Sequence, residues 1–218
     1  MFFVIDKNLT LTRIRKLKSD FHITGVILSN TRDINDKILK ELGECNCFIH
    51  FGHLTRIPII NKYENHQTLG KDRLAACIGA RKYFSEGNCL VIDMGTCITS
   101  DFLSDQNEFI GGNISPGIKL RLRAMNAYTD KLPLADIFLP ENMFGNNTIE
   151  ALQNGAVKGT LYEIDTFINL VLQKKSPINV MLTGGDAHYF ENYTKNKIFV
   201  APNLVLEGLN EILRYNAY

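Results

Sequence analysis

Short runs of β-branched and aromatic residues alternate with longer amphipathic stretches in this chain, and this alternation restricts its fold more than any other feature. The runs that predict strands lie at 2–6, 23–29, 47–51, 89–95, 108–115 and 178–185. The stretches with helical periodicity lie at about 33–43, 69–85, 117–127, 148–174, 187–194 and 205–214. Strands interleaved with helices in this way predict an α/β fold.

The ends of two predicted strands are alike, which indicates that part of the chain is duplicated. The segment from residue 4 reads VIDKNLT and the segment from residue 91 reads VIDMGTCIT, so in both an Asp is followed by small or polar residues. Such repetition is typical of an internal duplication, although two matches this short also arise by chance. No low-complexity linker separates the two parts. We therefore expect two halves that pack as one rigid unit with a cleft between them.

The composition is that of an ordinary globular protein, and it disfavours several functional classes. Of the 218 residues 45% are hydrophobic, and 24 basic against 23 acidic residues give a net charge of +1. Without a long basic run, nucleic acid is not an expected partner. No stretch approaches the roughly 18 apolar residues of a membrane helix, and the apolar start is too short for a signal peptide, so we expect a cytoplasmic protein without a membrane partner. The five cysteines predict reduced thiols rather than disulfides.

The stretch LVIDMGTCITSDFL (90–103) places polar residues where a buried strand should end. Gly95 allows backbone dihedrals that are closed to other residues, and it lets a ligand approach the backbone amides. Asp93 and Thr96 place a carboxylate and a hydroxyl beside that approach, which predicts a site for phosphate and a cation. The alternative is a hairpin corner in which Asp93 and Thr96 only satisfy the amides of the turn.

The stretch TLGKDRLAACIGA (68–80) places Asp72 and Arg73 in the first turn of a predicted helix. The positive end of the helix dipole and the neighbouring guanidinium both favour the ionised form of the Asp72 carboxyl. An ionised carboxylate in a cleft can accept a proton from a hydroxyl, and Arg73 can bind a substrate carboxylate with two hydrogen bonds. The alternative is an ordinary surface Asp-Arg pair.

Two glycine-rich segments follow, and each has a structural alternative. GGNISPG (111–117) suits backbone wrapped closely around a ligand, but Gly and Pro also mark ordinary turns. TGGDA (183–187) ends a strand and opens a helix whose free N–H groups can receive an anion or a ribose, or Asp186 can simply cap that helix. In this order, the motifs describe a nucleotide cleft between duplicated halves.

The same motifs resemble those of the type III pantothenate kinases, a family of the actin-like ATPase superfamily. The resemblance implies an α/β fold of duplicated ribonuclease H-like halves with an interlobe cleft. It implies a shortened N-terminal lobe at 1–66 and a C-terminal lobe at 67–218 that carries the nucleotide, cation and dimer elements. The matching segments are NKYEN (61–65), TLGKDRLAA (68–76), VIDMGTCITSDF (91–102), GGNISPG (111–117), KLPL (131–134), NNTIEALQNG (146–155), TGGDA (183–187) and NLVLEGLNEIL (203–213).

The activity implied by the resemblance is the transfer of the γ-phosphoryl group of ATP, with Mg²⁺, to the primary hydroxyl of pantothenate. This reaction makes 4'-phosphopantothenate, the first step of coenzyme A biosynthesis. Asp72 would be the proton acceptor, and Asp93 would coordinate the monovalent cation, K⁺ or NH₄⁺. The implied pantothenate-binding residues are Tyr63, Gly70, Lys71, Asp72, Arg73 and, from the second subunit of a homodimer, Thr148. The implied ATP-binding residues are Asp6, Asn8, Thr10, Thr96, Gly184 and Gly185.

The first phosphate loop departs from the family pattern, which is Asp-x-Gly-Asn-Thr. Here the strand ends VIDKNLTLTRI, so that Asn8 stands in place of the Gly when Asp6 is matched. A β-carbon at a position that needs a positive φ costs about 1 kcal/mol or more and displaces the amides that face phosphate. Two functions remain open at this point: an active pantothenate kinase, or a catalytically impaired relative that binds pantothenate or a protein partner in a regulatory role. Another sugar or acetate kinase of the superfamily is a less favoured third.

Overall fold

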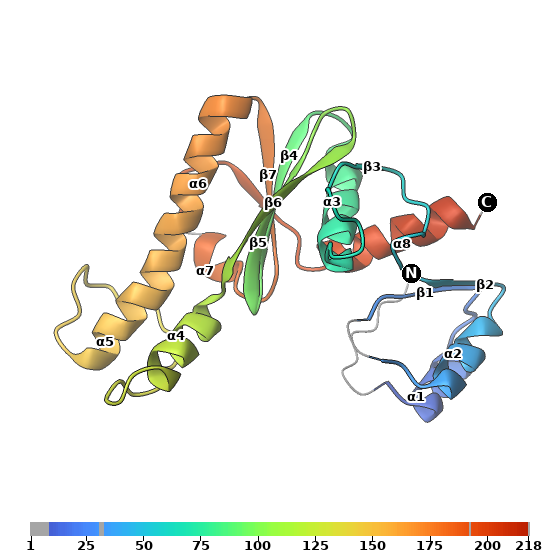
Figure 1. Cartoon of the computed structure of the whole chain (residues 1–218), viewed down its shortest axis with the longest axis horizontal. Coiled ribbons are helices and arrows are strands. Elements are labelled where there is room, and N and C mark those ends of the chain that lie inside the picture. The colour runs from blue at the N-terminus through green and yellow to red at the C-terminus, as the bar shows by residue number, and fades with distance from the viewer. Residues whose placement is uncertain (1–8, 31–32, 192, 218) are drawn as a thin grey trace.

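The computed structural model describes residues 9–30, 33–191 and 193–217, and it forms a small N-terminal lobe beside a larger C-terminal lobe (Figure 1). The strand predicted at 2–6, and with it Asp6 and Asn8, lies outside the described residues. Among the residues that are described, none of the helices combines the length and the apolar content that crossing a bilayer requires.

The N-terminal lobe is a parallel pair of strands covered by two helices. The strands align Gly25 with Cys47 and Leu28 with His50. Among the described residues of this lobe, Ile14, Ile38 and Leu42 form the buried apolar cluster. Its elements are α1 (Leu11–Asp20), β1 (Gly25–Leu28), α2 (Asp36–Gly43) and β2 (Cys47–His50). Helix α1 was not predicted, because Ile14 is its single buried residue and the sequence around it is mainly basic and polar.

The C-terminal lobe is built on a six-stranded mixed sheet with the order β3-β6-β5-β4-β7-β8. Strands β4, β5 and β6 form an antiparallel meander, and β7 and β8 continue the sheet parallel to β4. This is the α/β sheet expected of a ribonuclease H-like half. The strands are β3 (Ile60–Asn61), β4 (Asn88–Met94), β5 (Cys97–Leu103), β6 (Glu108–Pro116), β7 (Ile178–Thr183) and β8 (Ile198–Val200). Strand β3 lies on the N-terminal side of the division predicted at residue 66, yet it pairs with β6 of this sheet.

Helices cover both faces of this sheet (Figure 1). Because side chains alternate along β4, Val91 faces one helical layer while Leu90 and Ile92 face the other. The first layer contains α3 (Lys71–Tyr83) and α8 (Leu204–Asn216). The second contains α4 (Ile118–Ala127), α5 (Thr148–Gln153), α6 (Gly159–Lys175) and α7 (His188–Glu191). The single helix predicted at 148–174 is divided by a π-helical turn at Asn154–Lys158.

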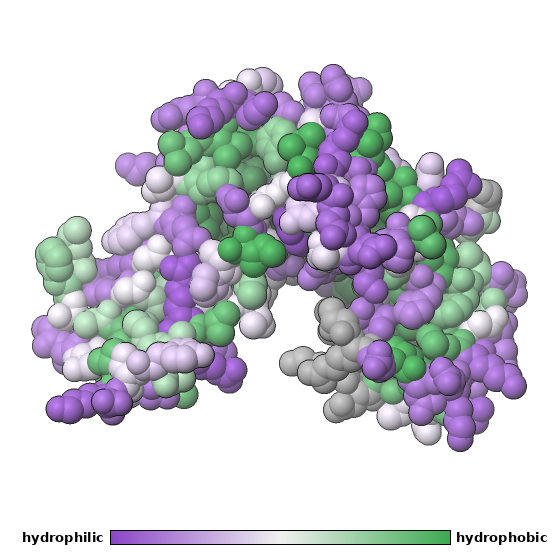
Figure 2. Space-filling model, viewed as in Figure 1, coloured by the Kyte–Doolittle hydropathy of each residue, from purple (hydrophilic) through white to green (hydrophobic). Residues whose placement is uncertain are grey.

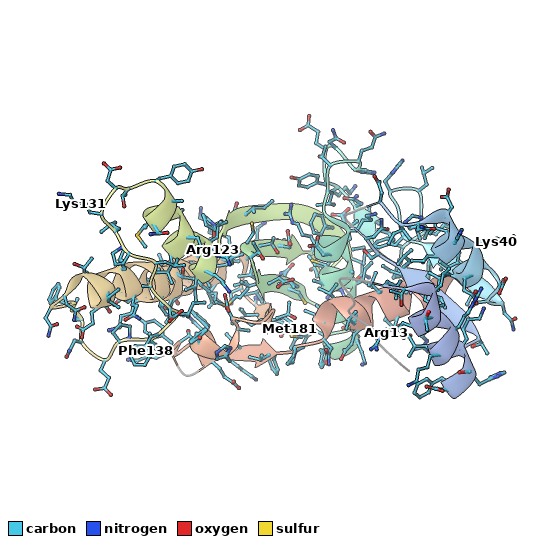
Figure 3. All side chains as sticks on the ribbon, turned by 90° about the horizontal axis from the view of Figure 1, so that it is seen from below. Arg13, Lys40, Arg123, Lys131, Phe138 and Met181 are labelled. Carbon is cyan, nitrogen blue, oxygen red and sulfur yellow. The ribbon has the colours of Figure 1, made fainter. Side chains whose placement is uncertain are left out.

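The molecule is elongated and hollowed on one side. The arm, defined here as residues 118–153 with α4 and α5, projects at one end of the molecule, and the N-terminal lobe lies at the other end (Figure 3). Figure 2 shows the deep hollow between them, below the six-stranded sheet. Helix α8 connects the two lobes, since the side chain of Leu213 lies 3.4 Å from the position that a β-carbon on Gly25 of β1 would occupy.

Helices α3 and α8 cross with their backbones in contact, and two glycines make this contact possible. A β-carbon added to Gly208 would lie 1.7 Å from the carbonyl oxygen of Ala75, and one added to Gly79 would lie 2.4 Å from the carbonyl oxygen of Leu204. Each distance is far below van der Waals contact, and the atoms that obstruct are backbone atoms. The crossing therefore requires glycine at both positions.

We predict that Gly208→Ala lowers the free energy of unfolding by about 2 kcal/mol or more, because the methyl group forces α8 away from α3. The matched control is Gly159→Ala in α6, where an added β-carbon meets no atom within 4 Å. The control should gain up to about 1 kcal/mol from the better helix propensity of Ala. Urea titration of both variants provides the measurement, and equal stability of the two would contradict the packing argument.

Candidate active site

A cleft of about 1920 Å³ lies between the two lobes, and six of the residues singled out from the sequence line it: Gly70, Lys71, Asp72, Asp93, Gly184 and Gly185. One wall is formed by the start of α3 and by the carboxyl ends of β4 and β7, and the other by β1 and α8. Asp72, Asp93 and Gly184 all line it. Residues that are distant in the sequence are thus brought to one cavity, as the motif order predicts.

Asp72 lies in the first turn of α3 and is exposed to the cleft. Its Oδ1 accepts a hydrogen bond of 2.9 Å from the backbone N–H of Arg73. Gly70 is the N-cap residue of the helix and has no side chain that could cap it. No N-cap side chain therefore lies between the Asp72 carboxylate and the backbone amides at the helix N-terminus. Gly70 and Lys71 line the same cleft. A substrate hydroxyl that enters the cleft can therefore reach the Asp72 carboxylate.

Asp93 lies near the carboxyl end of β4, on the face that α3 covers. Burial, together with the charges of Asp72 and Asp101, raises the pKa of this carboxyl to about 6. The backbone of Gly184, with a φ of +92°, passes so close that an added β-carbon would lie 2.5 Å from Asp93 Oδ1. Gly184 is therefore required beside this carboxylate.

Asp93 could supply one anionic oxygen to a cation in the cleft. Within the described ranges, no group of three or more His, Cys, Asp and Glu side chains could hold a metal ion. A carboxylate whose pKa is raised by burial gains stability from a positive charge placed next to it. Carboxylate oxygens suit hard cations.

Arg73 makes a buried ion pair that the sequence did not reveal. Its Nε donates to both carboxylate oxygens of Asp101, at 3.0 and 3.1 Å, and both side chains are almost fully buried. The alternative of a surface Asp-Arg pair in the first turn of α3 is therefore wrong for Arg73. Strand parity could have revealed Asp101, since it lies two residues from Thr99, which pairs with Asp93, and so shares the Asp93 face.

The remaining predicted site residues lie at different distances from the cleft. Thr96 is exposed in the tight turn between β4 and β5, outside the residues that line the cavity, whereas Gly185 lines it. Tyr63 lies over the Arg73 guanidinium, with 5.5 Å from Cζ to the ring centroid. The Thr10 hydroxyl caps α1 by accepting the Arg13 N–H at 3.3 Å. Thr148 begins α5 on the distant arm and is exposed there.

Comparison with known proteins identifies the family. The family model described as type III pantothenate kinase matches residues 4–170. The chain belongs to this family. The type III pantothenate kinase of Flavobacterium johnsoniae is 37% identical over 98% of this chain and 88% of its own length. That of Phocaeicola vulgatus is 41% identical over 96% of this chain and 87% of its own length.

A solved structure supports the fold. A Baf family protein from Campylobacter jejuni superposes with a TM-score of 0.59 at 24% sequence identity, over 93% of this chain and 88% of that one. At this level of identity the likeness concerns the fold alone. The predicted α/β class is confirmed by this likeness and by the mixed sheet with helices on both faces.

We predict that Asp93→Asn stabilises the protein at neutral pH in buffers without K⁺ or NH₄⁺. The pKa of this carboxyl is 3.8 in an unperturbed state and about 6 in the folded protein. The folded state therefore binds the proton more tightly, and stability falls as the pH rises through this window. Removing the charge should gain on the order of 2 kcal/mol at pH 7.

The gain should disappear as the pH is lowered toward 3.8, where the wild-type carboxyl is protonated in the folded state. Urea titrations of both proteins across this range measure it, with Asp105→Asn at an exposed loop position as the control. A gain that is the same at every pH would contradict the assigned cause.

Proposed function

We propose that the protein phosphorylates the primary hydroxyl of pantothenate with ATP and Mg²⁺. One observation carries the proposal: Asp72, Asp93 and Gly184 line the same cleft between the lobes. Asp72 is an exposed carboxylate in the first turn of α3, and Asp93 is a largely buried carboxylate beside the backbone of Gly184. The relatives in the type III family bear the name of this activity. Their substrate, carried over to this chain, is pantothenate.

The reaction requires mainly positioning and charge neutralisation from the protein. Asp72 accepts the proton of the pantothenate hydroxyl as the hydroxyl oxygen attacks the γ-phosphorus, and ADP leaves with the bridging oxygen. Gly184 and Gly185 bring backbone close to the nucleotide, and the hydroxyl of Thr96 holds a phosphate. Asp6, Asn8 and Thr10 complete the phosphate site from the N-terminal lobe, in the loop that departs from the family pattern.

The proposal includes a monovalent cation, K⁺ or NH₄⁺, beside Asp93. When bound, it supplies positive charge for the phosphate oxygens, which a lysine supplies in P-loop enzymes. Asp93 contributes the anionic oxygen that holds it. Because burial and the neighbouring carboxylates oppose ionisation of Asp93, its affinity for the cation should fall when the pH drops through about 6.

The arm supports a homodimer in which Thr148 reaches the partner's pantothenate site. One side of the segment between α4 and α5 is anchored in the core through Ala135 and its neighbours. The other side exposes large apolar side chains to solvent, with Met143 and Phe144 exposed by 71% and 79%. Phe138, which is also exposed, lies on the arm in Figure 3. Exposed apolar groups gathered on an anchored segment are typical of an interface.

Within this proposal the protein acts in the cytoplasm, without nucleic-acid or membrane partners. The substrate ATP is found there, and all five cysteines are unpaired, as a reducing compartment favours.

We predict that Asp72→Asn reduces kcat at least 100-fold, because an amide cannot accept the hydroxyl proton. Purified protein with ATP, Mg²⁺, K⁺ and pantothenate should release ADP in a coupled assay, and the variant should still bind pantothenate in calorimetry. The control is Asp105→Asn, at an exposed position outside the cleft. Pantothenate binding by the wild type without turnover would instead favour the impaired, regulatory relative.

We also predict complementation between two defective variants. Asp72→Asn lacks the proton acceptor, and Thr148→Ala lacks the contact that the partner donates. When equal amounts are mixed and allowed to exchange subunits, half the dimers contain one intact site of two. Activity should therefore recover to about a quarter of the wild-type value. If mixing restores nothing although sedimentation shows mixed dimers, Thr148 acts within its own subunit or not at all.

A further inference from the structure

The ion pair between Arg73 and Asp101 joins the first turn of α3 to the middle of β5. Arg73 is 5% exposed and Asp101 is 1% exposed. The guanidinium donates from Nε to both oxygens of the carboxylate and from Nη2 to Oδ1. This arrangement fixes both the distance and the plane of the two groups, which a single contact between point charges cannot do.

The surroundings hold this pair in one orientation. The Arg73 Cζ lies 5.5 Å from the ring centroid of Tyr63 and 5.8 Å from that of Phe109. On the other side lies β6, where a β-carbon added to Gly112 would be 2.3 Å from Asp101 Oδ1. Any side chain at position 112 would therefore displace the Asp101 carboxylate. Rings on one side and backbone on the other leave the pair little freedom to move.

The pair acts on the part of α3 that carries Asp72. The first turn of this helix has no side-chain cap, and its first backbone bond, from Leu74 N–H to the Gly70 carbonyl, is long at 3.5 Å. Arg73 is the next residue after Asp72, and its backbone N–H donates to the Asp72 carboxylate. Fixing the guanidinium therefore fixes the peptide that orients this carboxylate.

Stability alone gives no reason to keep such a pair. Burying two charges costs desolvation energy that their attraction does not always repay, and apolar replacements of similar volume are often as stable. The site adds to this cost, because Asp72 and Asp93 place further negative charge near Asp101. An ion pair that is present despite this desolvation cost and the nearby carboxylates points to a role in positioning neighbouring side chains.

We propose that Asp101 is a positioning residue for phosphoryl transfer: it holds the Arg73 guanidinium and thereby aims the Asp72 carboxylate into the cleft. This inference rests on the proposed function for its kinetic consequences, but not for its structural ones. Asp101 itself does not line the cleft. Its effect on the reaction passes through Arg73 and the first turn of α3.

The test uses Asp101→Asn, which keeps the shape of the side chain and removes its charge, and Asp101→Glu, which keeps the charge and displaces it by one methylene. The matched control is Glu207→Gln, because Glu207 binds Lys82 and Tyr83 in the last turn of the same helix. All four proteins are assayed at a temperature at which circular dichroism and thermal unfolding find each one folded.

We expect kcat to fall roughly 100-fold in Asp101→Asn and roughly tenfold in Asp101→Glu, while the KM for ATP stays within about threefold of wild type. Amide hydrogen exchange in a peptide that covers residues 70–80 should become faster in the same order. The Glu207→Gln control should match the wild type in kcat and in exchange at the start of α3.

Folded Asp101→Asn with kcat within about twofold of wild type and unchanged exchange would overturn the proposal. If Asp101→Asn does not fold, the same two results in Asp101→Glu decide the question. A loss of kcat that Glu207→Gln shares would equally overturn it, since it would reflect general loosening of the helix. If the wild type shows no turnover, the proposed function fails, and the exchange measurement still tests the positioning of α3.

Discussion

The site depends on the balance of charge between three carboxyl groups and the guanidinium buried against one of them. Asp72, Asp93 and Asp101 lie close enough that Asp72 raises the pKa of both of the others. Arg73 is committed to Asp101. Negative charge is therefore left on the cleft side of the sheet, where a triphosphate would add more. A cation placed here would offset the repulsion between these carboxylates and a phosphate group.

The scaffold keeps these groups in place through the crossing of α3 and α8. Gly79 and Gly208 allow the backbones of α3, which carries Asp72, and α8 to touch. The same α8 contacts β1 of the N-terminal lobe through Leu213. A shift of α8 would therefore alter both the position of the helix that carries Asp72 and one wall of the cleft.

The fold and much of the site could be predicted from the sequence because local signals carried them. The strand-like and helical runs predict β4, β6 and β7 and the helices of the C-terminal lobe, whereas β3, β5 and β8 were not predicted. Strand-end motifs predict that Asp93 and Gly184 line one cleft. Helix α1 was missed because only Ile14 is buried in it, so it lacks an apolar repeat. The partner of Arg73 was missed because 28 residues separate it from Asp101, and the contact depends on sheet register. Register is a tertiary property that a single sequence does not display.

The described parts of the two lobes differ in the size of their buried apolar clusters. Large clusters pack both faces of the C-terminal sheet, whereas Ile14, Ile38 and Leu42 form the buried cluster in the described part of the N-terminal lobe. Elements with few buried contacts open at lower free-energy cost than a core sheet. A ligand that binds in the cleft between the lobes adds contacts to both, and binding to the folded state alone stabilises the smaller lobe.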